Sequence, residues 1–347
     1  MKEIVVSTLS KSYQVKLGES ILGDIGDAIK GVISPQKIAI ITDANVQCHY
    51  GQSVKQSLEK AGFSPIVHVI TPGEGSKTLR VVEEILKKLA QLEFARSDAI
   101  VALGGGVVGD IAGFVASIYK RGIEFIQIPS SLLAIIDSSI GGKTGVNLDE
   151  GKNFVGAFYQ PSLVYADMRT LDTLPEREVT NGLGEMIKYA ILSNSNLYEM
   201  LKKGNALTLG AIEICINYKA DIVSKDERES KLRKLLNLGH TFAHAIEKLS
   251  KYNIAHGYAV AMGIALISNA CYRNSILAKE SCDKILDLLL QYNLPIESNY
   301  HIDDLIEAAR GDKKNDGKKI SFIGIREIGD CDIFELDPGE FRRFMLC

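Results

Sequence analysis

Short apolar runs alternate with helical patterns over the first half of the chain. The runs, each with the length of a buried strand, cover residues 37–42, 65–70, 99–106, 125–129 and 162–167. Between them, apolar residues recur three and four positions apart in 53–62 and 78–91, as on one face of an amphipathic helix. This alternation is typical of a parallel sheet whose strands are joined by crossover helices.

The pattern changes after about Leu174, where long helical patterns follow one another with few strand-like runs between them. Helices are predicted at 176–193, 208–227, 238–250, 258–274 and 279–292. A short hairpin is predicted at 318–336. We therefore expect an α/β domain with a parallel sheet over residues 1–170 and, apart from that hairpin, an all-α domain over 171–347.

Length and composition agree with two folded domains. The chain has 347 residues, of which 46% are hydrophobic and 24% charged, as in ordinary globular proteins. A net charge of −3 argues against a nucleic-acid binder or a polybasic membrane anchor. No apolar run reaches the ~18 residues that span a bilayer, and the N-terminus lacks the apolar stretch of a signal peptide. Because the six cysteines are far apart, we expect reduced thiols and a cytoplasmic location.

A glycine-rich turn is the first candidate binding feature. Gly104, Gly106 and Gly109 fit the pattern G-x-G-x-x-G between a predicted strand and a predicted helix. The backbone N–H groups of such a turn can hold a pyrophosphate, although the turn is also common as a purely structural element. It follows a later strand than in a Rossmann domain, so we predict a dinucleotide bound in a non-Rossmann manner. Two other strand ends offer Asp43, for a ribose hydroxyl, and the turn PGEGSKT at 72–78.

A second glycine-rich segment carries charged and polar side chains. It contains Asp137, Lys143, Lys152 and Asn153 among glycines that let the backbone approach a ligand closely. Lysine is a compact point charge suited to phosphate, and a nearby aspartate can orient substrate hydroxyls. The alternative interpretation is a solvated hairpin with surface lysines.

Three of the six histidines, His240, His244 and His256, fall within seventeen residues. His240 and His244 are four positions apart and lie on one helix face, as paired histidines do in many zinc sites. An oxygen ligand could come from Glu185, and Lys188, three residues later, faces the same way. Spacing alone leaves open whether His244 or His256 completes the metal site.

Taken together, four segments resemble the signature blocks of the 3-dehydroquinate synthase family, the sugar-phosphate cyclases of the shikimate pathway. The segments are 129–147, 151–161, 182–190 and 236–247, and the resemblance extends over nearly the whole chain in the family's order. Departures are few. Ser130 and Ser131 stand where threonines are usual, and Tyr159 stands where a histidine is usual.

The resemblance implies a dehydroquinate synthase-like fold and assembly. Residues 1–170 would form the NAD-binding domain and 171–347 the metal- and substrate-binding domain, with the active site between them in a homodimer. The implied substrate is 3-deoxy-D-arabino-heptulosonate 7-phosphate, and the products are 3-dehydroquinate and phosphate, on the route to chorismate and the aromatic amino acids. The implied lyase reaction combines transient oxidation by NAD, elimination of phosphate, return of the hydride and intramolecular aldol closure.

The resemblance also implies the site residues. Glu185, His240 and His256 would hold a catalytic zinc ion, which cobalt can replace, and His244 would then face the substrate. The NAD contacts would be Asp43, Pro72, Gly73, Glu74, Gly75, Ser76, Lys77, Gly106, Val107, Val108, Gly109, Asp110, Ser130, Ser131, Lys143, Lys152, Thr170, Leu171, Asp172 and Thr173. The substrate contacts would be Asp137, Lys143, Lys152, Asn153, Lys188, Lys219, Arg233, Asn237, His244 and Lys313, or Lys314 in its place, with Arg121 reaching in from the second subunit.

Three alternatives remain open at this point. Glycerol dehydrogenase and the iron-dependent alcohol dehydrogenases share this architecture, and sister cyclases act on glucose 6-phosphate or sedoheptulose 7-phosphate. A decayed relative would bind NAD or metal without catalysis. The segment DSSIGGKT, together with Lys219 and Arg233, favours a substrate that carries a carboxylate. These cations could form a local pocket for a small phosphorylated acid even though the whole chain is acidic.

Overall fold

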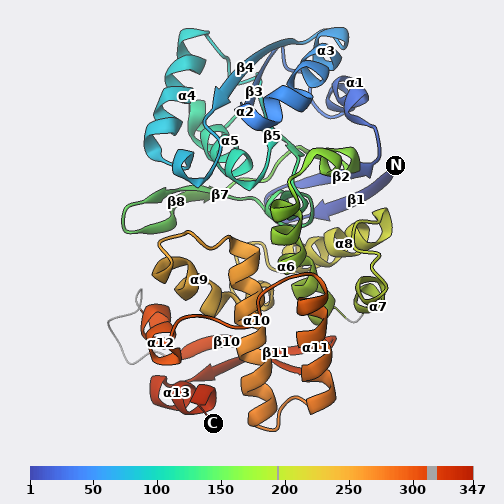
Figure 1. Cartoon of the computed structure of the whole chain (residues 1–347). Helices are drawn as coiled ribbons and strands as arrows, with labels where there is room; N and C mark the ends of the chain where they lie inside the picture. The colour runs from blue at the N-terminus through green and yellow to red at the C-terminus, as the bar shows by residue number, and fades with distance from the viewer. Residues whose placement is uncertain (194, 311–318, 347) are drawn as a thin grey trace. The chain divides into compact units, whose positions relative to one another are not determined.

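The computed structural model of the chain describes residues 1–193, 195–310 and 319–346, apart from the side chain of Arg310. Contacts divide the chain into two units, which we describe separately (Figure 1). The first unit comprises Met1–Pro175 and Lys219–Arg228, and the second comprises Glu176–Tyr218 and Glu229–Cys347. Among the described residues, no helix combines the length and the hydropathy that crossing a bilayer requires.

The segment Lys219–Arg228 belongs to the first unit, which differs from the predicted division of the chain. Its Glu227 is buried, and a carboxylate oxygen of Glu227 accepts a hydrogen bond of 2.9 Å from Gln160 Nε2 and one of 3.1 Å from the Thr8 hydroxyl. These bonds tie the segment to the first unit. The apolar periodicity of a helix does not indicate which neighbours the helix packs against. The sequence pattern therefore did not predict that Lys219–Arg228 belongs to the first unit.

A seven-stranded sheet forms the centre of the first unit. In order across the sheet, the strands are β1 (Lys2–Ser7), β2 (Ser12–Gly18), β9 (Leu163–Asp167), β6 (Glu124–Pro129), β5 (Ala99–Gly104), β3 (Lys37–Asp43) and β4 (Ser64–Ile70). The edge strand β1 is antiparallel to β2, and the other neighbouring pairs are parallel. The prediction of a parallel sheet from five apolar runs is confirmed.

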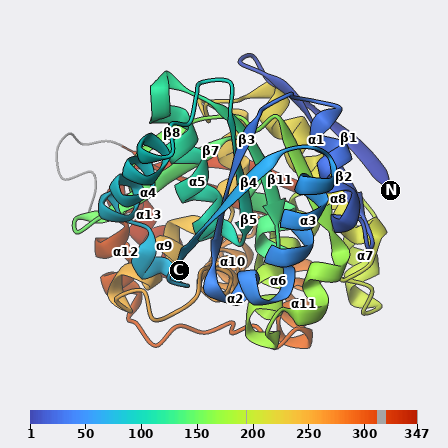
Figure 2. The ribbon, with the colours of Figure 1, turned by 90° about the horizontal axis from the view of Figure 1, so that it is seen from above.

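Helices cover both faces of this sheet (Figure 2). Ile38 and Ile40 of β3 pack with the helices α1 (Ile25–Lys30) and α3 (Gln52–Lys60), whereas Ala39 and Ile41 pack with α4 (Leu79–Gln91) and α5 (Gly106–Ile118). Side chains alternate between the two faces of a strand, so a strand that is buried on both faces must be apolar at every position. This requirement explains the continuous apolar runs in the sequence.

The carboxyl ends of β3 and β5 lie side by side where the chain changes direction across the sheet. From β3 the chain passes outward to β4 and then returns to β5 on the other side of β3. Open parallel sheets bind ligands in the crevice outside such a point. Asp43 is the last residue of β3 and Gly104 the last of β5, so two predicted cofactor-binding segments flank this position.

A separate hairpin, β7 (Lys143–Leu148) and β8 (Gly151–Phe158), completes the sheet structure of the first unit. It carries the second glycine-rich segment of the sequence. Short helical segments connect the larger elements of the first unit: η1 (Leu22–Asp24), α2 (Ala44–Val46), η2 (Gln47–Gly51), η3 (Glu74–Ser76), η4 (Tyr119–Arg121), η5 (Ala134–Ser138) and η6 (Met168–Thr173).

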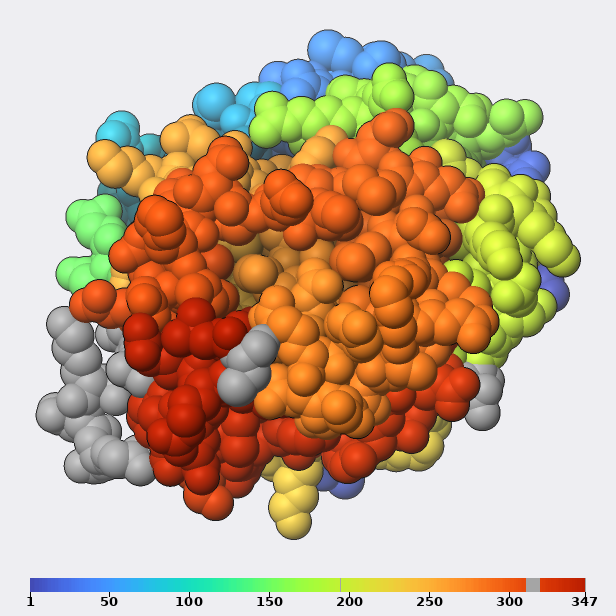
Figure 3. Space-filling view, turned by 60° about the horizontal axis from the view of Figure 1, so that its bottom comes forward, coloured from blue at the N-terminus to red at the C-terminus, as the bar shows by residue number. Residues whose placement is uncertain are grey.

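The second unit is built mainly from helices. They are α6 (Glu176–Leu192), α7 (Leu197–Lys202), the first part of α8 (Leu209–Lys225), η7 (Leu232–Asn237), α9 (His240–Leu249), α10 (His256–Arg273), α11 (Lys279–Gln291), α12 (Ile302–Arg310) and α13 (Pro338–Leu346). Figure 3 shows one face of this unit, on which the C-terminal segments in red lie against helices in orange. All five predicted long helices are present.

The hairpin predicted near the end of the second domain is present. Strands β10 (Ile320–Glu327) and β11 (Asp330–Leu336) form an antiparallel two-stranded sheet where the hairpin was expected. The ring of Phe322 lies 5.1 Å from that of Phe341 and 5.2 Å from that of Phe344. These aromatic contacts bury one face of the hairpin against α13 and so make it part of the core.

Candidate active site

Glu185, His240 and His256 come together in the second unit. Glu185 lies within α6, and the two histidines are the first residues of α9 and α10. Glu185 Oε1 lies 3.5 Å from His240 Nε2 and 3.2 Å from His256 Nε2. One ligand atom from each of the three residues lies within 4.8 Å of the others, so the group could hold a metal ion.

The donor set and its geometry fit a zinc or cobalt ion. Ligand atoms on a tetrahedral zinc, at about 2.0–2.1 Å from the metal, lie about 3.3 Å apart, close to the separations around Glu185 Oε1. Glu185 is fully buried; its Oε2 forms an ion pair with the Lys188 ammonium, and its Oε1 faces the two histidine rings. Two imidazoles and one carboxylate are the ligands of many catalytic zinc sites, and a buried ionised carboxylate is expected where cationic groups or a metal accompany it.

The protonation states of this group are set by burial and by its neighbours. Burial opposes the ionised form of Glu185, but the charge of Lys188, whose ammonium forms an ion pair with Glu185 Oε2, and the nearby histidines hold the pKa of the carboxyl well below its usual range. Burial lowers the pKa of His240 well below its usual value. Burial also disfavours charge on His256, but its hydrogen bonds to Glu185 and Glu247 raise its pKa to about 9. An ionised carboxylate and a neutral imidazole are therefore ready to bind a metal, whereas His256 must first release a proton.

His244 lies beside this group but is not part of the set of close ligand atoms. Its ring centroid is 5.6 Å from that of His240 and 6.3 Å from that of His256. The geometry therefore favours His256 over His244 as the second imidazole ligand. Spacing of four on a helix places two side chains on one face but does not aim them at the same point, which is why the sequence pattern alone left the choice open.

Glycines beside the three ligands allow their helices to touch backbone to backbone. A methyl group on Gly184 would lie 2.2 Å from the carbonyl oxygen of Gly257, and one on Gly257 would lie 1.8 Å from that of Asn181. Gly239, which precedes His240, has a left-handed φ of 78°. Only glycine fits these positions, so each of the three ligands lies next to a glycine at which two backbones approach closely.

Glu247 is a buried residue of this site to which sequence analysis assigned no role. Its Oε1 lies 3.4 Å from His256 Nδ1, and it is 3% exposed. His240 Nδ1 similarly lies 3.1 Å from the carbonyl oxygen of Leu238. Each contact engages Nδ1 and leaves Nε2 directed towards Glu185, an arrangement that orients histidines in metal sites. The signal was present in the sequence, because Glu247 is seven positions, two helical turns, after His240.

Replacing Glu247 should weaken metal binding without removing a ligand. We expect Glu247→Ala to lower zinc affinity by about 10–100-fold, because His256 loses the acceptor that fixes its ring, and Glu247→Gln to have a smaller effect. Competition titrations with a chelator of known affinity measure the change. Glu199→Gln, at an exposed position on α7, is the matched control. Unchanged zinc affinity in Glu247→Ala would contradict the assigned role.

Most of the predicted cofactor contacts lie at one edge of the sheet in the first unit. Asp43 ends β3, residues 72–77 follow β4, residues 106–110 open α5 after β5, Ser130 and Ser131 follow β6, and residues 170–173 lie in η6 after β9. The carboxyl ends of parallel strands share one edge of a sheet. The structure therefore brings together segments that are far apart in the sequence.

The N-terminus of α5 suits a pyrophosphate. Gly105, the residue that precedes this 13-residue helix, has no side chain with which to cap the first turn. The first N–H groups of a helix lack partners within the helix and bear a partial positive charge, so they favour an anionic group. Nearby, Lys77 Nζ lies 2.5 Å from Asp110 Oδ2, and burial raises the pKa of Asp110 against the opposing charge of Lys77.

The second glycine-rich segment forms the hairpin β7–β8 and the turn before it. Lys143 begins β7, and Lys152 and Asn153 lie in β8. Asp137 precedes the hairpin in η5, and its side chain and carbonyl oxygen accept hydrogen bonds from Lys219 Nζ, the latter at 2.7 Å. The hairpin alternative is thus correct as a description of the backbone, and it carries the predicted ligand residues.

The remaining predicted substrate contacts lie in several places. Arg121 is exposed in η4 with a left-handed φ of 67°. Arg233 and Asn237 lie in η7 of the second unit, where Arg233 is 2% exposed and Asn237 Nδ2 donates a 2.6 Å hydrogen bond to Glu229. Lys313 and its alternative Lys314 lie outside the described residues.

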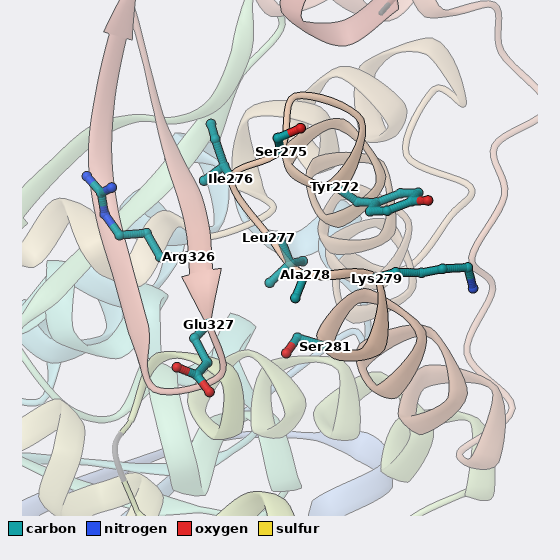
Figure 4. Close-up of a pocket in the computed structure, with 9 residues that line it drawn as sticks. All are labelled: Tyr272, Ser275, Ile276, Leu277, Ala278, Lys279, Ser281, Arg326 and Glu327. Atoms are coloured by element: carbon teal, nitrogen blue, oxygen red, sulfur yellow. The ribbon is translucent and has the colours of Figure 1, made fainter.

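A pocket of about 600 Å³ lies elsewhere in the second unit (Figure 4). It is lined by residues from the end of α10, the start of α11 and strand β10, among them Tyr272, Lys279 and Arg326. None of the predicted site residues lines it. The candidate metal site is therefore defined by its converging side chains rather than by this pocket.

The sequence is similar to that of known proteins along nearly its whole length. The family model 3-dehydroquinate synthase N-terminal matches residues 67–181, and 3-dehydroquinate synthase C-terminal matches 182–315. The 3-dehydroquinate synthase of Alkaliphilus metalliredigens is 40% identical to this chain over 355 residues, covering 99% of this chain and 98% of the relative.

Solved structures of related cyclases share the fold. A 2-epi-5-epi-valiolone synthase from Streptomyces hygroscopicus subsp. jinggangensis, with NAD+ and Zn2+ bound, is 28% identical, with a TM-score of 0.87 over 98% of each chain. A 2-deoxy-scyllo-inosose synthase complexed with carbaglucose-6-phosphate, NAD+ and Co2+ is 26% identical, with a TM-score of 0.86 over 99% of each chain. Because both family models match, and because this chain is 40% identical to a curated member over 99% of its own length, the chain belongs to the 3-dehydroquinate synthase family.

Proposed function

We propose that this protein is a 3-dehydroquinate synthase, a lyase that converts 3-deoxy-D-arabino-heptulosonate 7-phosphate into 3-dehydroquinate and phosphate. The observation that carries the proposal is the buried group of Glu185, His240 and His256 in a chain that is 40% identical to a 3-dehydroquinate synthase along almost its full length. The two solved cyclases that hold NAD+ with Zn2+ or Co2+ are more distant, at 28% and 26% identity.

NAD is proposed to bind at the carboxyl edge of the sheet in the first unit. When bound, it would accept a hydride from a substrate alcohol and take part in returning it within the same turnover. Asp43, whose carboxylate accepts hydrogen bonds from the backbone N–H groups of Asn45 and Val46, is proposed also to accept hydrogen bonds from ribose hydroxyls, and the first N–H groups of α5 are proposed to hold the pyrophosphate. The Lys77–Asp110 pair and Glu74 hold the neighbouring loop in place beside them.

Glu185, His240 and His256 are proposed to hold a zinc or cobalt ion. When bound, that ion would polarise substrate oxygens as a Lewis acid. Lys188 stabilises the ionised carboxylate, while Glu247 and the carbonyl of Leu238 keep both imidazole rings in the orientation for binding. His244, next to the group but outside it, is proposed to contact a substrate hydroxyl.

Buried cations are proposed to bind the two anionic groups of the substrate. Lys188 and Arg233 in the second unit and Lys219 in the first are 1%, 2% and 6% exposed. Lysine is a compact point charge suited to phosphate, and a guanidinium can bind a carboxylate with two parallel hydrogen bonds. Lys219 holds Asp137, which is proposed to orient a substrate hydroxyl. Fixing the substrate in this way can contribute about 7–11 kcal/mol to lowering the barrier in favourable cases.

The protein is also proposed to act as a homodimer in which Arg121 completes the site of the second subunit. Arg121 is exposed and held in an uncommon backbone conformation. Co-expression of Arg121→Ala with His256→Ala chains tests this. Mixed dimers would contain one intact site, so about a quarter of wild-type activity should return although each variant alone is inactive. Absence of any recovery in purified mixed dimers would contradict the sharing of Arg121.

A substrate panel tests the proposed specificity. Phosphate release should be fastest with 3-deoxy-D-arabino-heptulosonate 7-phosphate and should require both NAD and a divalent metal. Glucose 6-phosphate and sedoheptulose 7-phosphate lack the carboxylate, so they cannot make the contacts proposed for the carboxylate of the heptulosonate. Preference for either of these sugars would assign the chain to a sister cyclase activity.

A further inference from the structure

Asn147, near the end of β7, joins two segments of the first unit that carry different predicted ligands. Its Nδ2 donates a 2.8 Å hydrogen bond to Glu74 Oε1, and its Oδ1 accepts a 2.9 Å hydrogen bond from the backbone N–H of Asn153. Its own backbone N–H donates to the carbonyl oxygen of Lys77 at 2.8 Å. One residue therefore contacts both the loop after β4 and the strand β8.

The two hydrogen bonds of the side chain fix the orientation of its amide. If the amide were turned over, Oδ1 would face the Glu74 carboxylate and the NH₂ group would face the N–H of Asn153. Both contacts would then be repulsive. The carboxamide is planar, so the position of Glu74 and that of the Asn153 backbone are linked through one rigid group.

The hydrogen bond from the Asn153 N–H to Asn147 supports an uncommon backbone conformation. The φ of Asn153, 57°, lies in the left-handed region, which asparagine adopts more readily than other non-glycine residues and which the hydrogen bond from its N–H to Asn147 helps to hold. The neighbouring Lys152 shares this stretch of β8. Movement of the Asn147 amide would therefore change the placement of two predicted substrate contacts, Lys152 and Asn153.

We propose that Asn147 is a positioning residue that couples the cofactor loop to the substrate hairpin. The inference rests on the proposed function, in which Glu74 and Lys77 contact NAD, Asn153 contacts the phosphorylated substrate, and Lys152 contacts both. Ordering of Glu74 by bound NAD fixes the Asn147 amide and thereby the N–H of Asn153. By thermodynamic reciprocity, an anion held by the hairpin must then tighten the binding of NAD by the same factor.

The test is the affinity of the metal-loaded full chain for NAD, measured by calorimetry with and without saturating inorganic phosphate. In the wild type we expect phosphate to tighten NAD binding by about fivefold or more, at the lower end of typical coupling. In Asn147→Ala this factor should fall to one. In Asn147→Asp the retained oxygen still accepts from Asn153, but the new carboxylate repels Glu74, so coupling should also be lost.

A rescue variant and a control separate positioning from a merely structural role. Asn147→Asp combined with Glu74→Gln reverses donor and acceptor across the same contact, so the coupling factor should recover even if NAD binds more weakly overall. Glu150→Gln, at an exposed position in the turn of the hairpin, should leave the factor unchanged.

Two results would overturn the inference. The first is a coupling factor in Asn147→Ala that equals the wild-type factor, whatever happens to its melting temperature. The second is a wild type that binds NAD and releases phosphate from the heptulosonate but shows no effect of phosphate on NAD affinity; this leaves the proposed function standing. A wild type that binds no NAD would contradict both.

Discussion

Replacing His256 by alanine is expected to abolish both stoichiometric metal binding and turnover. His256 Nε2 is 3.2 Å from Glu185 Oε1, and loss of this ligand leaves only one imidazole and one carboxylate for the ion. Structural and catalytic zinc sites in proteins have at least three protein ligands, so the remaining pair should not retain zinc through dialysis. Metal content by mass spectrometry and phosphate release measure the two effects.

His244→Ala is the matched control for this experiment. His244 lies on the same helix as His240 but outside the group of close ligand atoms, so its loss should leave the metal bound and reduce turnover only. Full metal occupancy in His256→Ala, together with metal loss in His244→Ala, would show that the ligand assignment is wrong.

Replacing Gly257 by alanine is expected to disturb the metal site through packing alone. The added methyl group would lie 1.8 Å from the carbonyl oxygen of Asn181, so α10 must move away from α6. Overpacking of this kind costs about 1–3 kcal/mol of unfolding free energy. Because His256 precedes Gly257 and Glu185 lies on α6, zinc affinity should fall as well. Urea unfolding of the metal-free protein and zinc titration measure the two changes.

Gly210→Ala is the control, since it makes the same chemical change in another helix. Gly210 lies in α8, and the nearest atom to an added methyl group is Met200 Cε at 3.6 Å, an ordinary contact distance. Alanine is the better helix former by about 1 kcal/mol, so this variant should be as stable as the wild type or more stable. Equal stability and zinc affinity in Gly257→Ala and Gly210→Ala would contradict the packing argument.

The sequence predicted elements whose pattern follows directly from burial. Strand β3 is apolar along its length because Ile38 and Ile40 face one helix layer while Ala39 and Ile41 face the other. The five long helices of the second unit were recognised by their apolar periodicity. The periodicity of apolar residues indicates which face of a helix or strand is buried. These elements were predicted correctly because burial of that face determines whether the segment forms a helix or a strand.

What the sequence could not predict depends on contacts between distant segments. Nothing local marks Lys219–Arg228 as part of the first unit, because its attachment rests on Glu227 meeting Thr8 and Gln160. Likewise, Asn147 looks like an ordinary strand residue until the fold brings Glu74 and Asn153 to its amide.

The candidate metal ligands include residues that the sequence pattern predicted and one that it could not choose. Spacing identified His240 and placed Glu185 beside Lys188, but it could not choose between His244 and His256 as the second imidazole ligand. Family resemblance indicated His256, and the geometry around Glu185 Oε1 favours the same choice. The reason is that His256 begins a different helix, whose approach to α6 is set by Gly184 and Gly257 rather than by any periodic pattern.

Net charge does not decide whether a chain can bind a small anionic ligand. A chain of charge −3 does not suggest an anionic substrate, yet Lys188, Lys219 and Arg233 are nearly inaccessible to solvent. The overall charge governs solubility and non-specific association, whereas binding of a small phosphorylated acid depends on a few cations in one place.

The most direct test of the proposed function follows phosphate and NADH together. The protein is mixed with 3-deoxy-D-arabino-heptulosonate 7-phosphate, NAD and zinc, and both products are recorded over time. A 3-dehydroquinate synthase returns the hydride within each turnover, so one phosphate should appear per substrate consumed with no net accumulation of NADH. NADH formed in proportion to substrate consumed, without phosphate release, would instead identify a dehydrogenase and contradict the account.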